Sequence, residues 1–313
     1  MTRRQSIWSL AALSTAALIW ASHNVAGAWL TKTLHPVAAN LIRTNLASLL
    51  YIPILLRYKG RSRFARNDLP RLVLAALFLA AFFQLFYWAL QRAGAGYVAV
   101  TLALGPALTC ALGVPYLGEK LTGRAVAGLI IALTSATALG FARARAAVEL
   151  GAWHAAAPAF TATLAFAHYT LLSKPLLRRY PVPYVLGWTV CLGTVFLWLY
   201  VPVSGMRLAA LRAANWPHWL ALSYIALFMN VFSYILYNRA LQKLPAGVTH
   251  AVTVYVTTLF ALVMVRFVLN EAVPAVYWAC AGAIALGVWL TATAPPAPTP
   301  SSGSRPVQAL RGP

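Results

Sequence analysis

Apolar residues form long stretches along most of the chain, separated by short breaks that are charged or rich in Pro and Gly. A stretch of about 20 apolar residues is long enough to cross a bilayer as an α-helix. Cutting the chain at the breaks predicts ten helices, near residues 7–30, 36–56, 70–90, 97–117, 123–141, 152–173, 183–203, 219–241, 247–269 and 273–293. The pattern therefore predicts an all-α membrane protein with ten transmembrane helices, followed by a disordered tail over 294–313.

Composition excludes a water-soluble fold. The chain is 61% hydrophobic and 9% charged, whereas soluble domains carry about 25% charged residues. The formal net charge of +21 could indicate nucleic acid, but the basic residues lie between the apolar stretches and form no single patch. We therefore expect the lipid bilayer as a partner and no nucleic acid. The cysteines Cys110, Cys191 and Cys280 fall inside predicted spans, so we expect reduced packing residues and no metal site.

Lys and Arg are distributed unevenly between the predicted loops. If the N-terminus is cytoplasmic, the outside segments keep only Lys32, Arg92, Arg143, Arg145, Arg207 and Arg212. The loop from Arg57 to Arg71 is the most basic inside segment. The positive-inside rule then predicts a multi-pass protein of the cell inner (plasma) membrane with both termini in the cytoplasm.

The first stretch has an alternative interpretation as a secretion signal. Arg3 and Arg4 precede it, and Ala26-Gly27-Ala28 resembles a cleavage site. The stretch stays apolar to Leu30, longer than the apolar part of a signal peptide, and its loss would disrupt an internal repeat. We therefore interpret it as the first helix.

The two halves of the chain repeat each other. The matches are Trp20 with Phe166, Ala89–Arg92 with Ala240–Lys243, and Glu119 with Glu271. Five predicted helices separate equivalent positions, so the second half must cross the membrane in the opposite orientation to the first. Inverted repeats are typical of alternating-access transporters. We expect a first five-helix repeat over 1–145, an inverted repeat over 146–293 and a cytoplasmic tail over 294–313.

These positions also give the chain a resemblance to the drug/metabolite transporter superfamily, EamA-type branch, from about Ile7 to Leu290. The matching features are Trp20, Pro36 followed by Arg43, Tyr87-x-x-Leu90, Pro106, Gly118-Glu119, Tyr237-x-x-x-Leu241, Gly247 and Asn270-Glu271. Two positions depart from the family pattern: Thr258 stands where proline is usual, and Ala21 follows Trp20 where glycine is usual. The resemblance implies a ten-helix bundle that exports amino acids or related metabolites. It also implies a central cavity lined mainly by helices one, three, four, six, eight and nine.

Polar side chains inside the predicted helices are the candidate substrate-binding residues, because polar groups at membrane depth tend to face a cavity or a partner helix. Helical spacing places Asn230, Ser233, Tyr234 and Tyr237 on one stripe. The full candidate set is Ser22, His23, Asn24, Gln84, Tyr87, Trp88, Thr101, His168, Asn230, Tyr234, Thr253 and Thr257. For the threonines, hydrogen bonding between packed helices is the alternative.

The fourth predicted helix carries the candidate flex points Gly105, Pro106 and Pro115. Proline removes a backbone donor, and glycine permits bending. We expect these residues to take part in gating.

Charged and titratable residues inside the predicted helices are few. His23, His168 and His250 are candidates to carry protons, with a structural role as the alternative. The acids fall in loops or at span ends, which disfavours a carboxylate-driven pump. Arg43 lies deep in the second helix, where it either pairs with helix-end carbonyls or meets an anionic group.

The pattern as a whole favours a secondary transporter that exports amino acids or related small metabolites by alternating access. A nucleotide-sugar or sugar-phosphate exchanger is the alternative within transport. A membrane-embedded enzyme is disfavoured because the predicted spans contain neither acids nor an HxxxH spacing, and a receptor without flux is the third class. We expect no cofactor, and a monomer or a homodimer.

Overall fold

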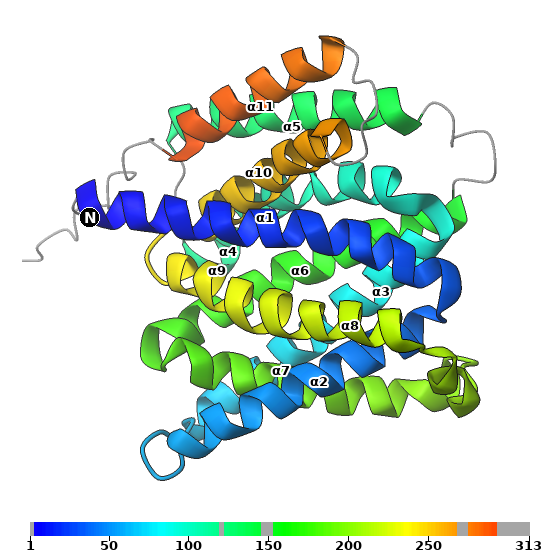
Figure 1. Cartoon of the computed structure of the whole chain (residues 1–313). Helices are drawn as coiled ribbons and strands as arrows, with labels where there is room; N and C mark the ends of the chain where they lie inside the picture. Colours follow the sequence, from blue (N-terminus) through cyan, green and yellow to red (C-terminus); the bar gives the residue numbers. More distant parts are fainter. Residues whose placement is uncertain (1–2, 119–121, 145–152, 268–274, 293–313) are drawn as a thin grey trace, which may run out of the picture.

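The computed structural model describes residues 3–118, 122–144, 153–267 and 275–292, and over these residues the chain is helical without a strand (Figure 1). The predicted tail over 294–313 and the acids Glu119, Glu149 and Glu271 lie outside the described residues. The α-helices are α1 (Arg3–Thr33), α2 (Pro36–Arg57), α3 (Leu69–Leu102), α4 (Gly105–Leu117), α5 (Gly123–Ala144), α6 (Trp153–Arg179), α7 (Val182–Tyr200), α8 (Trp216–Tyr224), α9 (Tyr234–Leu241), α10 (Ala246–Phe267) and α11 (Ala275–Ala292). A π-helix, η4 (Ile225–Ser233), joins α8 to α9, and the short 3₁₀ turns are η1 (Arg66–Asp68), η2 (Val201–Val203) and η3 (Leu208–Ala213).

Several helices are long and apolar enough to cross a membrane. Within the described part of the chain four segments meet both conditions, Pro36–Arg57, Arg66–Arg92, Val182–Val203 and Trp216–Leu241. Shorter apolar helices cover Gly105–Leu117, Gly123–Ser135, Ala246–Phe260 and Trp278–Thr291. Large apolar side chains such as Leu56, Leu199 and Trp289 point outward, as expected for a surface in contact with lipid.

The break that the sequence predicted between residues 90 and 97 is wrong. α3 continues through this segment to Leu102, and the chain turns at Ala103 and Leu104 instead. Two glycines in the segment do not end the helix, since membrane helices tolerate glycine. The turn falls before Gly105-Pro106 because proline has no N–H with which to continue the hydrogen-bond ladder of α3.

The eighth predicted helix, over 219–241, is α-helical only at its two ends. The middle turns form η4. π-Helical turns are rare in proteins as a whole, and those that occur are often found at functional sites. The wider turn changes which neighbours the following side chains meet. Asn230 contacts α2, whereas Ser233 accepts a hydrogen bond from Trp20 Nε1 of α1 at 2.9 Å.

The helices run roughly side by side in Figure 1, with α5 and α11 at one edge of the bundle and α2 and α7 at the opposite edge. Between these edges α3 packs along α6, and α1 packs along η4, α9 and α10. α4 contacts α10 and α6. The centre of the bundle is therefore built by α1, α3, α6, η4 and α10.

Two glycines bring the α5 and α11 backbones together. A Cβ added at Gly128 would lie 2.6 Å from the Gly287 carbonyl oxygen, and a Cβ at Gly287 would lie 2.6 Å from the Gly128 carbonyl oxygen. Small residues at such crossings allow close backbone approach, which drives helix association in lipid.

The basic loop between α2 and α3 is fixed to the turn between α6 and α7. Arg179 donates from Nη1 to both carboxylate oxygens of Asp68, each at 3.1 Å, and the Tyr180 hydroxyl donates to Asp68 Oδ2 at 2.9 Å. The same hydroxyl accepts from the Ala65 backbone N–H. One carboxylate thus ties the two halves of the chain together at this end of the bundle.

Candidate functional site

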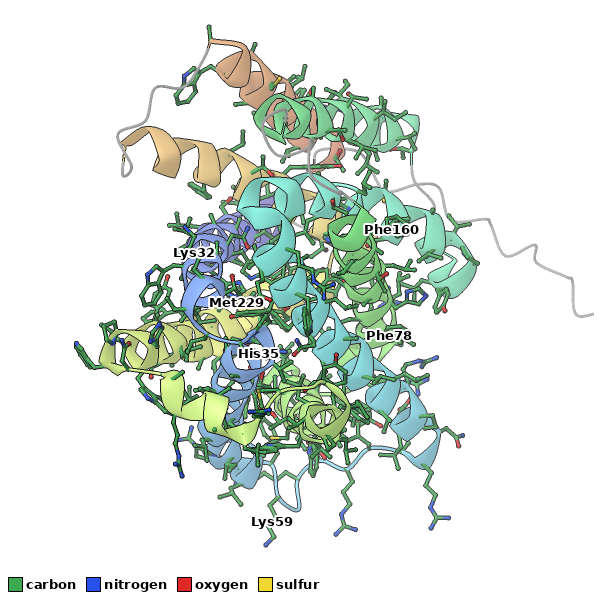
Figure 2. The ribbon with its side chains drawn as sticks, turned by 90° about the vertical axis from the view of Figure 1, so that its right-hand side faces the viewer. Lys32, His35, Lys59, Phe78, Phe160 and Met229 are labelled. Atoms are coloured by element: carbon green, nitrogen blue, oxygen red, sulfur yellow. The ribbon has the colours of Figure 1, made fainter. Side chains whose placement is uncertain are left out.

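A cavity of about 70 Å³ lies at the centre of the bundle, lined by residues of α1, α3, α6, η4 and α10. Figure 2 shows one of its lining residues, Met229, in the interior of the molecule. The lining residues are Trp20, His23, Asn24, Phe82, Phe83, Phe86, Leu102, Thr163, Phe166, Met229, His250, Val254, Thr257 and Thr258.

Aromatic rings form most of the cavity wall. The indole of Trp20 meets the Phe166 ring edge-on, with centroids 5.6 Å apart, and Phe166 packs on Phe82 at 4.8 Å. Tyr234 and Tyr237 lie behind Trp20, with centroids at 5.6 and 5.3 Å. A mostly apolar wall with a few polar groups is typical of small-molecule sites.

Three of the predicted substrate-binding residues, His23, Asn24 and Thr257, line this cavity. His23 Nε2 lies 3.2 Å from the Tyr87 hydroxyl, so part of its hydrogen-bonding capacity is used within the protein. Thr257 donates to the carbonyl oxygen of Ala17 at 3.2 Å. The Asn24 amide makes no side-chain hydrogen bond to the described residues, so it is available to a ligand.

His250, a proton-carrier candidate, also lines the cavity and is fixed by its neighbours. Its Nδ1 lies 2.6 Å from the Thr109 hydroxyl, and its ring packs edge-on against Phe166 at 4.9 Å. A Cβ added at Gly105 would lie 2.7 Å from the imidazole. The predicted flex point Gly105 therefore provides the space that this histidine occupies.

A second, smaller pocket of about 20 Å³ lies beside the cavity, between α2, α3, α7 and η4. Arg43 is its only cation among the described lining residues, and its side chain is 1% exposed. Nη1 donates to Asn230 Oδ1, and Nη2 donates to Asn40 Oδ1 at 2.6 Å and to Thr44 Oγ1 at 3.3 Å. The guanidinium carbon sits 3.8 Å from the centre of the Phe83 ring.

Three further predicted site residues, Gln84, Asn230 and Tyr234, gather around this arginine. Gln84 accepts from Asn40 Nδ2 at 3.1 Å. Each is buried and keeps one polar atom without a hydrogen-bond partner: Gln84 Nε2, Asn230 Nδ2 and the Tyr234 hydroxyl. Arg43 Nε is also without a partner. Buried donors of this kind are rare in folded proteins and call for a physical explanation.

Other predicted site residues are held within or between helices. Ser22 Oγ shares a 2.7 Å hydrogen bond with the Tyr224 hydroxyl on the outer side of α1. The Thr101 carbonyl oxygen accepts from Thr163 Oγ1 at 3.3 Å. Thr253 donates to the Thr249 carbonyl of its own helix. The first two contacts join neighbouring helices, as expected from residues that pack helices together, and the third lies within one helix.

Trp88 and His168 lie apart from both pockets. The Trp88 ring carries the guanidinium of Arg92, 4.5 Å from its centroid. The His168 imidazole stacks on Phe78 with a centroid distance of 4.8 Å. Figure 2 places Phe78 toward the side of the bundle, away from Met229. Neither ring is among the lining residues of the cavity.

The two predicted proline flex points occupy different parts of α4. Pro106 stands in its first turn, where a missing N–H is tolerated, and Pro115 stands inside the helix near its end at Leu117. α4 ends at Gly118, whose φ of 62° is left-handed.

Sequence reasoning missed the aromatic wall because it searched for polar groups at membrane depth. Phe82, Phe83 and Phe86 carry no polar atom, and their spacing is as typical of ordinary packing as of a site. The one usable signal was the match of Trp20 with Phe166, since residues near a pseudo-symmetry axis meet their own equivalents.

Comparison with known proteins gives the family. The model of the EamA-like transporter family matches twice, over residues 7–141 and 154–293. The chain belongs to the EamA-like transporter family. The resemblance seen in the sequence is thereby confirmed, and this EamA-like protein is a multi-pass membrane transporter for a small molecule.

Two relatives and one solved structure accompany this match. A protein of Streptantibioticus cattleyicolor described as a "Probable terminal-alkyne amino-acid exporter" is 27% identical over 218 residues, 69% of this chain and 70% of that protein. An "Uncharacterized transporter" of Archaeoglobus fulgidus is 32% identical over 127 residues, 40% of this chain and 43% of that protein. A solved crystal structure shares the fold with a TM-score of 0.70 at 16% identity, over 90% of this chain and 95% of that chain.

Proposed function

We propose that this EamA-like transporter exports amino acids or related small metabolites by alternating access at the central cavity, between two inverted five-helix repeats. The observation that carries the proposal is the position of the cavity, which takes its wall from α1 and α3 of the first half and from α6, η4 and α10 of the second. A site shared by both halves changes its access when one half moves against the other.

Reciprocal contacts between equivalent residues support the repeat. Trp20 touches its match Phe166. Ser48 and Thr194 are as far apart in the chain as Trp20 and Phe166 are. Their hydroxyls share a hydrogen bond at 2.7 Å. Two halves related by a two-fold axis bring equivalent residues together where they approach that axis.

The direction of the paired helices supports inversion. A Cβ at Gly128 would meet Thr291, and a Cβ at Gly287 would meet Ala132. Residue numbers thus rise along α5 as they fall along α11, so the two helices are antiparallel. An axis that relates antiparallel helices lies across them, in the membrane plane, as an inverted repeat requires.

The cavity wall favours a small, partly apolar substrate. Aromatic faces bind apolar groups and attract an ammonium group, and Asn24 offers hydrogen bonds. The relative described as an amino-acid exporter adds support for this substrate class. A nucleotide sugar or sugar phosphate needs several cations for its phosphates, whereas Arg43 is the one cation that the described lining of the two pockets supplies.

Flux measurement on the purified protein in proteoliposomes tests the proposal. We expect counterflow of apolar amino acids such as L-leucine above that of protein-free liposomes. Flux of a nucleotide sugar or sugar phosphate without amino-acid flux would contradict amino-acid export and indicate a nucleotide-sugar or sugar-phosphate exchanger. Turnover of a compound without flux would indicate an enzyme instead.

The proposed topology has both termini in the cytoplasm, on the same side of the membrane as the loop from Arg57 to Arg71. The Asp68 and Arg179 pair then holds the two halves together on the cytoplasmic side. Reporter fusions to both ends test this orientation, and a periplasmic signal from either end would contradict it.

A further inference from the structure

The Arg43 pocket holds a positive charge that the described part of the chain does not neutralise. An arginine side chain stays charged in proteins, and burying a charge is costly unless it is paired. Its hydrogen-bond partners Asn230, Asn40 and Thr44 are neutral. The one acid that the structure describes, Asp68, is bound by Arg179 instead.

Unused donors belong to this pocket and to the residues next to it. Arg43 and Asn230 line the pocket. Gln84 is hydrogen-bonded to Asn40, and the Tyr234 ring packs against Phe83 with centroids 6.0 Å apart. Arg43 Nε, Asn230 Nδ2, Gln84 Nε2 and the Tyr234 hydroxyl are buried without a hydrogen-bond partner. All four groups can donate a hydrogen bond. A positive charge together with several unsatisfied donors matches a ligand that only accepts, such as a carboxylate.

One aromatic ring separates this pocket from the central cavity. Phe83 lines both, and the neighbouring residues Met229 and Asn230 of η4 line one each. The face of the Phe83 ring covers the guanidinium at 3.8 Å. The Tyr87 ring is farther from the guanidinium, at 5.8 Å, so Phe83 is the nearer of the two rings.

We propose that Arg43 binds the carboxylate of the transported molecule, which reaches it from the central cavity when the Phe83 ring moves off the guanidinium. The carboxylate replaces the ring as the partner of the cation and accepts hydrogen bonds from the unused donors. The apolar part of the same molecule stays among the rings of the cavity. This assignment rests on the proposed function and narrows it to carboxylate-bearing substrates, amino acids among them.

Calorimetric binding of matched probes to the purified full-length protein tests the assignment. L-leucine and L-leucinamide differ at the carboxylate. We expect the wild type to bind leucine roughly 10- to 100-fold more tightly, the range for hydrogen bonds to a charged group. Arg43→Gln should bring the affinity for leucine down to that for the amide, and leave the amide within about threefold of wild type.

Lys174→Gln is the matched control, because it removes another buried cation, which donates to the Leu244 carbonyl away from both pockets. It should keep the wild-type ratio of acid to amide affinity.

Arg43→Lys keeps the charge and is the variant to use if Arg43→Gln does not fold. We expect it to reduce the ratio at least about threefold, since ammonium lacks the planar fork of guanidinium. An unchanged ratio in either Arg43 variant would overturn the assignment.

Isovalerate, a carboxylate without an ammonium group, separates this assignment from the proposed function. Isovalerate binding that is lost in Arg43→Gln, with no leucine flux, would keep the carboxylate site and remove amino-acid export. Leucine flux, together with a ratio of leucine to leucinamide affinity that Arg43→Gln leaves unchanged, would keep amino-acid export and remove the carboxylate site. Failure of the wild type to bind either acid would overturn the carboxylate site.

Discussion

Along α5 and α11 the helix backbones touch through glycine, whereas around the central cavity aromatic rings hold the helices apart. Gly128 and Gly287 leave no room for one added carbon, while the rings of Trp20, Phe82 and Phe166 meet at the centre in edge-on and tilted contacts. Helix backbones in direct contact cannot adjust to each other by changing a side-chain rotamer. Rings can rotate, so the central region can change its shape while the α5–α11 pair holds its geometry. The difference separates the scaffold from the site.

Overpacking the α5–α11 contact is expected to give the largest effect. Gly287→Leu places a side chain against the backbone of Gly128 and against Ala132, and should destabilise the protein by about 3 kcal/mol or more. Thermal unfolding in detergent measures the loss. Gly282→Leu is the matched control on the same helix, because a Cβ there meets no atom within 4 Å. Equal losses in the two variants would contradict the tight packing assigned to this pair.

Loss of the Asn230 side chain should be the next largest effect. Asn230→Leu removes the acceptor for Arg43 Nη1 and leaves that buried cation with one hydrogen bond fewer. We expect the free energy of unfolding to fall by about 1.5 to 3 kcal/mol. Asn45→Leu removes a half-buried amide from the outer part of α2, where its partners are the Leu41 carbonyl and Trp198, and should lose about 1 kcal/mol. If unfolding shows Asn45→Leu to be the more damaging change, Asn230 is not a main support of the arginine.

A cavity residue with an unused amide should affect binding more than folding. Asn24→Leu is expected to weaken substrate binding roughly tenfold, because the ligand loses a hydrogen bond in a low-dielectric site. The melting temperature should stay near that of wild type. Thr134→Leu on the exposed face of α5, where the hydroxyl bonds only to its own helix, should change neither quantity. The cavity assignment fails if Thr134→Leu weakens binding as much as Asn24→Leu.

The smallest effect is expected at Thr257. Its single hydroxyl proton is shared between the carbonyl oxygens of Ala17 and Thr253, so it has no free donor to offer a ligand. Thr257→Val should lower stability by about 1 kcal/mol and change the KM for flux less than threefold. A tenfold rise in KM would show that substrate competes for this hydroxyl.

The sequence was sufficient for the all-helical membrane class, the family and most helix positions, because apolar length and charged breaks decide these features. It was insufficient where backbone geometry departs from the regular α-helix. The continuation of α3 to Leu102 depends on the tolerance of membrane helices for glycine, and η4 leaves no mark in the pattern of residues 225–233.

The candidate site was predictable only in part, for a related reason. Spacing alone placed Asn230 and Tyr234 on a stripe, but a stripe does not say which neighbour each residue meets. Asn230 turns to Arg43, and His168 turns away to Phe78. The helical periodicity that groups residues on one face carries no information about the helix opposite, so contacts between distant segments had to come from the structure.

Alternating access at the central cavity is tested most directly by cysteine accessibility. Thr257→Cys, in a background with Cys110, Cys191 and Cys280 replaced, places one thiol in the cavity wall. A membrane-impermeant thiol reagent is then applied to right-side-out and to inside-out vesicles. The account predicts labelling from both sides, slowed from each side by a transported substrate. Labelling from one side alone, with no protection by substrate, would contradict it.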